Sequence, residues 1–184
     1  MQILTTPHPF LKHVAKPVTV WDKKTAKEVK QMEEILKRAT NPKGIGLAAT
    51  QVGLDKRLFI LLDEENKKTK VFVNPEIITA GKKMLSTVYK KKKDRWLEGC
   101  LSIPTIWGFV DRPYEITVKC QRPILLEIGN WKLEIVTEEF SDVASAYIQH
   151  ELDHLDGILF TDRIRQQKGV ILRETTDGLT PIIL

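Results

Sequence analysis

His150, Glu151 and His154 have the residue types and the spacing of a metal site that carries its own base. On a helix, residues four positions apart lie above one another, so both imidazoles can face one ion. Glu151 lies beside them, within reach of a water bound to that ion. Histidines are more often surface or hydrogen-bonded core groups than ligands, but two of the four here flank one glutamate. The His-Glu-x-x-His pattern is typical of metal-assisted hydrolysis.

The surrounding residues predict the helix that this pattern needs. Ser141 is a good N-cap, and Asp142 places a negative charge in the first turn, where it suits the helix dipole. Val143 and Tyr147 share a face with the histidines, and Gly157 is a natural helix stop. Burying such a polar face is costly unless a metal or hydrogen bonds satisfy it, which favours a functional site.

A catalytic metal usually has three protein ligands and one open position, so a third ligand must come from elsewhere. Asp153 and Asp156 are near in sequence, but their spacing points them away from the histidine face. Cys100 lies in a segment with turn character, residues 98–102, which could approach a metal closely. Cys120 lies in an alternating strand pattern, where a small buried hydrophobic residue is the better interpretation.

The composition is that of a soluble globular protein. The 184 residues fit one domain, 1–184, with 42% hydrophobic and 29% charged residues. No apolar run has the length of a membrane span, and the N-terminus lacks the layout of a signal peptide, so we expect a cytoplasmic protein. A disulfide between the two cysteines is not expected in that reducing compartment.

The net charge of +5 is concentrated in one segment. Its basic residues, offset locally only by Asp94, are Lys82, Lys83, Lys90, Lys91, Lys92, Lys93 and Arg95. A solvated loop is the favoured interpretation of such a run. The alternative is attraction to nucleic acid such as ribosomal RNA, without reading of base sequence, because no aromatic residues are interleaved.

The hydrophobic patterning predicts an α+β fold with mostly antiparallel sheets packed around the metal-binding helix. A first helix is expected over residues 24–39, and strands over 57–62, over 70–73 up to Asn74-Pro75, and over 115–121. Residues 124–128 and 131–136 flank Gly129-Asn130 as a hairpin, with Trp131, Leu133 and Ile135 on its buried face. The tail, 169–184, has no helical period and is expected to be a final strand or a loose end.

Three segments together resemble the hallmark motifs of the peptide deformylase family. They are Gly-Ile-Gly-Leu-Ala-Ala-Thr-Gln at 44–51, Glu-Gly-Cys-Leu-Ser at 98–102, and Gln-His-Glu-Leu-Asp-His-Leu-Asp-Gly at 149–157. Their order and separations are similar to those of the family, as is the N-terminal pattern from Ile3 to Val18. The resemblance covers about residues 1–165. His-Glu-x-x-His alone is shared with many proteases, but the cysteine motif is not.

The resemblance implies a reaction and a role for each motif. The enzyme would remove the N-formyl group from the initiator methionine of a nascent polypeptide and release formate. Cys100, His150 and His154 would bind the metal, and Glu151 would be the general acid and base. A metal supplies the nucleophile by acidifying its bound water. The side-chain amide of Gln51 and the backbone N–H of Leu101 would stabilise the oxyanion.

The resemblance also implies how the substrate binds. An extended peptide would add as a strand, with its backbone paired to Ile45, Gly46 and Gly99. Gly44 and Gly46 would permit its close approach. Ile45 and Tyr147, which lies three residues before His150 on the same face, are our candidates for the pocket of the methionine side chain.

The implied cofactor is one divalent metal, and the implied partners are nascent chains. A cysteine with two histidines suits zinc, iron, nickel or cobalt, and the family implies Fe²⁺. We expect a monomer that meets the ribosome transiently, without a membrane partner. Many members end in a long basic helix linked to ribosome docking, whereas this chain ends in Pro-Ile-Ile-Leu at 181–184, so docking by that route is not expected.

Two rival interpretations share the same helix. A general metallopeptidase would usually use a third histidine or glutamate ligand, and the motif around Cys100 argues against it. A basic ribosome- or RNA-associated module would hold a structural metal, but structural zinc sites normally have four protein ligands. No fourth ligand is evident in the sequence, and Glu151 would have no role in such a site.

Overall fold

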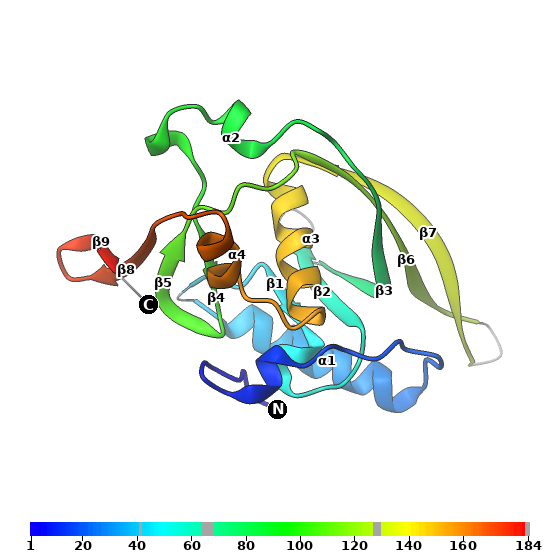
Figure 1. The fold of residues 1–184 in the computed structure, drawn as a ribbon. Helices are drawn as coiled ribbons and strands as arrows, with labels where there is room; N and C mark the ends of the chain where they lie inside the picture. The colour runs from blue at the N-terminus through cyan, green and yellow to red at the C-terminus, as the bar shows by residue number, and fades with distance from the viewer. Residues whose placement is uncertain (41, 64–67, 127–129, 183–184) are drawn as a thin grey trace.

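The computed structural model describes residues 1–40, 42–63, 68–126 and 130–182 (Figure 1). The helical segments are η1 (Pro9–Lys12), α1 (Lys23–Arg38), η2 (Ala49–Val52), α2 (Leu85–Val88), η3 (Lys92–Asp94), α3 (Asp142–Leu155) and α4 (Phe160–Gln166). The strands are β1 (Gly46–Ala48), β2 (Leu58–Asp63), β3 (Lys68–Ala80), β4 (Glu98–Cys100), β5 (Ile103–Gly108), β6 (Glu115–Leu125), β7 (Trp131–Ser141), β8 (Ile171–Thr175) and β9 (Gly178–Ile182).

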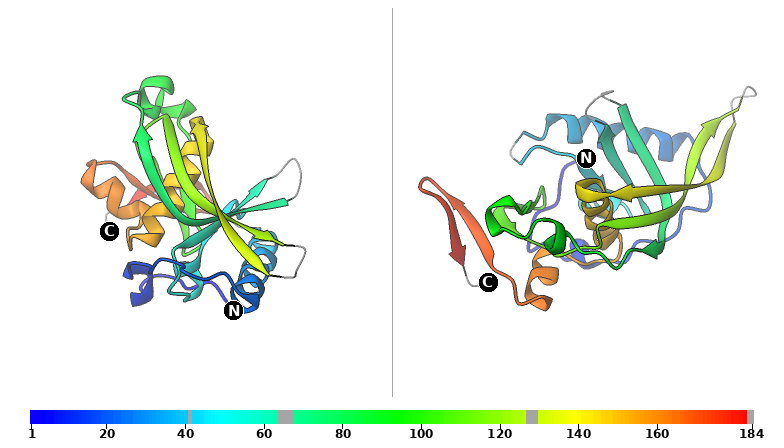
Figure 2. Two further views of the ribbon diagram at one scale, coloured as in Figure 1. Left: turned by 90° about the vertical axis from the view of Figure 1, so that its right-hand side faces the viewer. Right: turned by 90° about the horizontal axis from the view of Figure 1, so that it is seen from above.

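Within the described ranges, the strands form two antiparallel sheets. The larger has the order β1-β2-β3-β6-β7 and the smaller the order β4-β5-β8-β9. The predicted α+β class with mostly antiparallel pairing is therefore confirmed. Helix α3 runs between the two sheets, whereas α1 lies on the other side of the larger sheet (Figures 1 and 2).

Strand β2 shows why both faces of the larger sheet are covered. Successive side chains of a strand point to opposite faces. Leu58 and Ile60 lie in a core cluster with α1, whereas Phe59 lies in a second cluster with α3. Five of its six residues are therefore apolar, and the first three, Leu58, Phe59 and Ile60, are buried.

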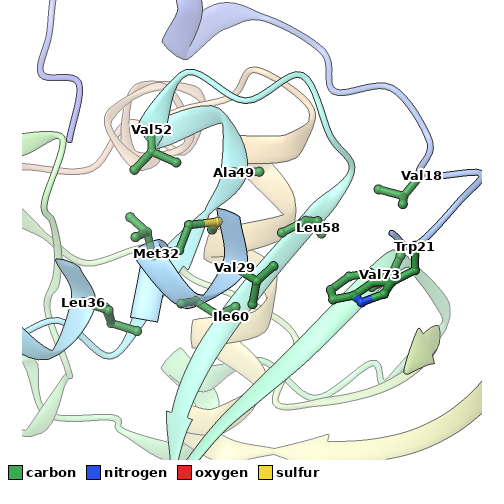
Figure 3. Close-up of a cluster of buried hydrophobic side chains, with 11 residues drawn as sticks. Val18, Trp21, Val29, Met32, Leu36, Ala49, Val52, Leu58, Ile60 and Val73 are labelled. Atoms are coloured by element: carbon green, nitrogen blue, oxygen red, sulfur yellow. The ribbon is translucent and has the colours of Figure 1, made fainter. Parts of the chain in front are cut away.

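Helix α1 contributes one apolar stripe to the first cluster (Figure 3). Val29, Met32 and Leu36 follow helical spacing and are buried against the sheet. The Asp22 side chain accepts a hydrogen bond from the Thr25 N–H at 2.7 Å and caps the helix. The predicted helix over 24–39 is confirmed to within one residue at each end.

Helix α3 packs its apolar stripe, Ile148, Leu152 and Leu155, into the second cluster. In that cluster Phe59 and Phe72 stack with their centroids 4.5 Å apart. Ser141 occupies the N-cap position as predicted, although its side chain makes no capping hydrogen bond, and the predicted stop at Gly157 is confirmed. Because the apolar stripe faces the larger sheet, the polar residues of α3 are left to face β4 of the smaller sheet.

Strand β3 contradicts one expectation. It continues through Asn74-Pro75 to Ala80, where the sequence predicted an end. The ladder with β6 shifts register between Val73 and Glu76, and a bulge of this kind leaves a position that needs no ladder N–H. Asn74 has φ 49°, and its side chain exchanges two hydrogen bonds of 2.8 Å with the Val18 backbone. These bonds hold the kink.

The hairpin of β6 and β7 is longer than predicted. β6 runs through Pro123 to Leu125, so 115–121 and the start of 124–128 are one strand. Pro123 lies beyond Gln121, the last residue of β6 paired with β3, where a missing N–H is tolerated. The predicted turn includes Gly129, which lies outside the described residues.

The expected buried face of β7 is wrong at one position. Trp131 and Leu133 pack on the α1 cluster, but Ile135 is 60% exposed. Val136 and Phe140, on the opposite face, pack on the α3 cluster instead. Near its start β7 is covered by α1 on one face, and further along it is covered by α3 on the opposite face. The alternation of apolar residues therefore does not mark one buried face along the whole strand.

The tail forms the hairpin of β8 and β9, so the expectation of a final strand is confirmed. Ile171 of β8 joins a third core cluster with Ile106 of β5 and Phe160 and Ile164 of α4. Cys100, at the end of β4, belongs to the same cluster.

Gly157 fixes how α3 ends, and replacing it by alanine should destabilise the fold. Its φ of 68° is in the left-handed region, and a Cβ there would lie 2.4 Å from the Lys12 carbonyl oxygen. We expect Gly157→Ala to lower the free energy of unfolding by about 2–4 kcal/mol in urea titrations. Gly81→Ala, where a Cβ has ordinary contacts of 3.4 Å, is the matched control. Equal losses for the two variants would contradict this explanation.

Candidate active site

Cys100, His150 and His154 converge between β4 and α3. One potential ligand atom from each lies within 4.8 Å of the others, and all three side chains are buried. The two rings, one helical turn apart on α3, have centroids 5.0 Å apart. Cys100 Sγ is 3.1 Å from His154 Nε2 and accepts a hydrogen bond from the Ser102 N–H at 3.4 Å. The turn after β4 thus directs the sulfur toward α3.

A buried chain of charged groups supports this cluster. Glu98 accepts a hydrogen bond from His150 Nδ1 at 2.8 Å. It also accepts two from Arg112, from Nε at 2.6 Å and from Nη2 at 3.0 Å. Arg112 Nη1 donates to Asp153 at 2.8 Å, so the chain returns to α3. When His150 is neutral and its Nδ1 proton is donated to Glu98, Nε2 carries the lone pair that a metal would bind.

The charges within the chain stabilise one another. Burial disfavours ionisation of Glu98, but the Arg112 charge and the hydrogen bonds from His150 and Arg112 outweigh it and lower the Glu98 pKa to about 2. For His150, burial alone would lower the pKa, but Cys100 and Glu98 raise it. Burial and the neighbouring His150 lower the pKa of His154.

Neither aspartate of the motif segment joins the cluster. Asp153 also accepts a hydrogen bond from Arg163 Nη2 at 2.5 Å, and Asp156 pairs with Arg57 at 2.6 Å. No sequence pattern singled out Glu98 or Arg112 as partners of the histidine. The position of Glu98, two residues before the predicted ligand Cys100, could have indicated that it lies near the metal cluster. Arg112 is distant in sequence and becomes a neighbour of Glu98 only through the fold.

Glu151 is buried next to the two histidines. Its Oε2 atom has no hydrogen-bond partner among the described residues. A Cβ built at Gly46 would lie 2.3 Å from Glu151 Oε1, so only glycine at 46 leaves room for this carboxyl group. Burial is the main cause that raises the Glu151 pKa to about 7, against the opposing charge of His150. Such a carboxyl can take up and return a proton near neutral pH.

The donor set fits a catalytic transition metal. One thiolate and two imidazoles are three ligands of the kind that iron, zinc, nickel and cobalt accept. The unpartnered Glu151 oxygen beside them agrees with a site that leaves room for a further polar group. Within the described ranges, Cys100, His150 and His154 are the one group of this kind.

Gln51 reaches the cluster from η2. Its Oε1 accepts a hydrogen bond from the Ala48 N–H at 2.8 Å, which closes the local turn. Its Nε2 is thereby directed toward Ser102 Oγ at 3.1 Å and Cys100 Sγ at 3.5 Å. Gln51 therefore both caps a turn and presents an amide donor beside the metal cluster.

A cavity of about 320 Å³ opens onto the cluster. The residues predicted for catalysis and substrate binding that line it are Ile45, Gly46, Gln51, Gly99, Leu101, Tyr147 and Glu151, together with Cys100 and His150. β1 is an edge strand of the larger sheet and β4 an edge strand of the smaller one, and both border this cavity. Trp96 and Trp107, which no sequence pattern had singled out, also line it, with Trp96 edge-on to Tyr147 at 5.0 Å.

Comparison with known proteins identifies the family. The sequence profile of the polypeptide deformylases matches residues 1–170. The chain belongs to this family. The peptide deformylase of Chromobacterium violaceum is 38% identical over 173 residues, which cover 91% of this chain and 89% of that protein.

Solved structures agree with the sequence comparison. The peptide deformylase of Thermotoga maritima superposes with a TM-score of 0.70 at 33% identity, covering 88% of this chain and 95% of the other. The Met-Ala-Ser-bound class I type b peptide deformylase of Acinetobacter baumannii superposes with a TM-score of 0.71 at 27% identity, covering 89% and 98%.

Membership of the deformylase family makes the chain an enzyme, a metal-dependent hydrolase that acts on formylated nascent peptides. The rival interpretations, a general metallopeptidase and a non-catalytic basic module, are not supported. Within the part of the chain that the structure describes, no helix is both long and apolar enough to cross a membrane.

The raised pKa of Glu151 predicts a pH-dependent stability of the metal-free deformylase. The unfolded chain ionises Glu151 near the ordinary value of 4.5 and the folded protein near 7. The stabilising effect of the protonated carboxyl is complete below about pH 4.5 and is lost as the pH rises through 7. Relative to Glu151→Gln, the wild type should therefore lose about 2–3 kcal/mol of stability between about pH 5 and about pH 8.

Urea unfolding of the two metal-free proteins at both pH values measures this difference. Glu34→Gln, at an exposed position of α1, is the control and should show no such trend. A difference between wild type and Glu151→Gln that is the same at both pH values would contradict a raised pKa.

Proposed function

We propose that Cys100, His150 and His154 hold the catalytic metal of this deformylase and that Glu151 is its acid and base. The observation that carries the proposal is their convergence: three buried ligand groups and one unpartnered carboxyl oxygen meet at a cavity between two sheet edges. Ferrous iron is the proposed physiological metal, and zinc, nickel or cobalt could replace it. When bound, the metal lowers the pKa of a water and polarises the formyl carbonyl.

Glu151 moves the proton in this proposal. Its carboxyl group is buried beside the two histidines with one oxygen unpartnered, so it can accept a proton from a water at the cluster and return it. The proton taken from the attacking water is given to the amine nitrogen of methionine as the bond to the formyl carbon breaks. Formate and a free N-terminus are the products. Gly46, which has no Cβ, leaves room for this carboxyl group at the cavity wall.

Gln51 and Leu101 are proposed to stabilise the oxyanion that forms on the formyl oxygen. The Gln51 amide is fixed by its bond to Ala48, so its Nε2 points at the cluster without further ordering. Leu101 lies in the turn after β4 and lines the cavity, and its backbone N–H is the second proposed donor. A fixed donor of this kind typically contributes about 10²–10³-fold to the rate.

The substrate backbone is proposed to lie between β1 and β4. Each is an edge strand that borders the cavity, so a peptide strand could pair with Ile45 and Gly46 on one side and Gly99 on the other. Ile45 and Tyr147 are proposed to contact the methionine side chain. The Acinetobacter baumannii relative was solved with Met-Ala-Ser bound, which supports a peptide of at least three residues as the substrate.

We further propose that the whole chain, 1–184, is one catalytic domain that acts as a monomer in the cytoplasm and meets the ribosome transiently. The basic segment around Lys90 and Lys91, whose side chains are exposed, is the surface proposed for that encounter.

Formate release from formyl-Met-Ala-Ser tests the function. Protein prepared without oxygen and loaded with Fe²⁺ should release formate, and no cleavage of the Met-Ala bond should occur. Glu151→Gln should lower kcat by about 10²–10⁴-fold while its metal content, measured by elemental analysis, stays equal to that of wild type. Absence of formate with iron confirmed in the protein, or an active Glu151→Gln, would contradict the proposal.

A further inference from the structure

A second hollow lies next to the candidate substrate cavity, against the same strand. It has a volume of about 470 Å³ and lies on the face of the smaller sheet that points away from the core. Trp107 and Leu172 are paired in the ladder, and their neighbours Ile106 and Ile171 are core residues. Because side chains alternate, Trp107 and Leu172 must lie on the outer face.

The floor of this hollow is apolar and accessible. It is formed by Leu97, Phe109, Val170 and Leu172. The Val170 side chain is 58% exposed, and the other three are half-buried. Apolar side chains that line an accessible hollow can take up the apolar parts of a ligand.

The rim is cationic. Lys93, Arg95 and Lys168 line the hollow, and within the described ranges no ion pair joins any of them to an acid. The Arg95 guanidinium lies 4.7 Å from the centroid of the Phe109 ring, and its Nε donates to the Tyr89 carbonyl at 3.3 Å. A positive rim over an apolar floor suits a ligand that carries both carboxylates and apolar groups.

The hollow is continuous with the candidate substrate cavity. Leu97 lines both. Trp107 lines the substrate cavity, packs over Gly99 closely enough that a Cβ there would lie 2.6 Å from its ring, and pairs with Leu172 of the hollow. A peptide substrate that extends from the metal cluster beside β4 and the residues before it would pass Gly99, then Leu97, then Arg95.

We propose that this hollow binds the formyl peptide downstream of its first residues and that Lys93, Arg95 and Lys168 favour aspartate or glutamate side chains there. The inference rests on the proposed function, since it extends the proposed path of the substrate. Leu97 and Arg95 precede Cys100 by three and five residues. An extended peptide that runs beside this segment with its methionine at the cluster would therefore place about its fourth to sixth residues at the hollow.

The test compares kcat/KM for two extensions of one substrate. Formyl-Met-Ala-Ser is extended by three aspartates or by three lysines, and formate release is measured with each. We expect the iron-loaded wild type to prefer the acidic extension by about threefold to tenfold, which is the size of effect of exposed ion pairs. The preference should decrease as salt is added, because exposed charges are screened.

The variant Lys93→Glu/Lys168→Asn should remove or reverse the preference and leave the rate with formyl-Met-Ala-Ser unchanged. Asparagine is chosen at 168 because Lys168 has φ 54°, which asparagine tolerates. Lys27→Glu/Lys30→Asn, at exposed positions of α1, makes the same change in net charge and should keep the preference.

Three results would overturn the inference. Equal rates with both extensions in wild type would show that the hollow does not select charge. An unchanged preference in Lys93→Glu/Lys168→Asn would place the selection elsewhere. If that variant kept the peptide preference but weakened binding of a fluorescent single-stranded RNA in anisotropy titrations, the partner would be nucleic acid. No formate from formyl-Met-Ala-Ser itself would instead refute the proposed function, so the two failures are distinguishable.

Discussion

The buried ion pair between Glu98 and Arg112 is the interaction on which the rest of the site depends. It joins the start of β4 to α3, because Glu98 also binds His150 and Arg112 also binds Asp153. Removal of one partner of such a pair leaves an uncompensated buried charge, which typically costs about 3–5 kcal/mol. The pair therefore matters less as a source of net stability than as a constraint on geometry. With it in place, His150 has one tautomer and one orientation, and Cys100 stays opposite the two histidines.

The two sheets supply the second constraint. α3 buries its apolar stripe against the larger sheet, and on its other side Glu98 of β4 binds His150 and Arg112 binds Asp153. The edges of β1 and β4 are consequently held on either side of one cavity, with Glu151 against Gly46 at its wall. The same arrangement that satisfies the polar side of α3 leaves two unpaired strand edges, which is where an extended peptide can add.

The sequence predicted the features that depend on local spacing. The histidine pair on α3, its N-cap at Ser141, its end at Gly157 and the stripe of α1 all follow from periodicity and capping residues. The sequence predicted strand ends, buried faces and side-chain partners less well where these depend on contacts between two elements. Asn74-Pro75 signals a strand end locally, but its bonds to Val18 turn it into a bulge inside β3. Ile135 alternates correctly but lies where neither helix covers the sheet. Arg112 and Trp107 reach the site only through sheet register and side-chain packing, for which the sequence carries no local signal.

If Cys100, His150 and His154 together bind one metal, X-ray absorption at the zinc edge of zinc-loaded protein will detect all three ligands. We expect one sulfur neighbour at about 2.3 Å from the zinc and two nitrogen neighbours at about 2.0–2.1 Å. The sulfur should disappear in Cys100→Ala and persist in Cys120→Ala, where the cysteine is buried in the core of the larger sheet. A wild-type spectrum without sulfur, or a sulfur that persists in Cys100→Ala, would contradict it.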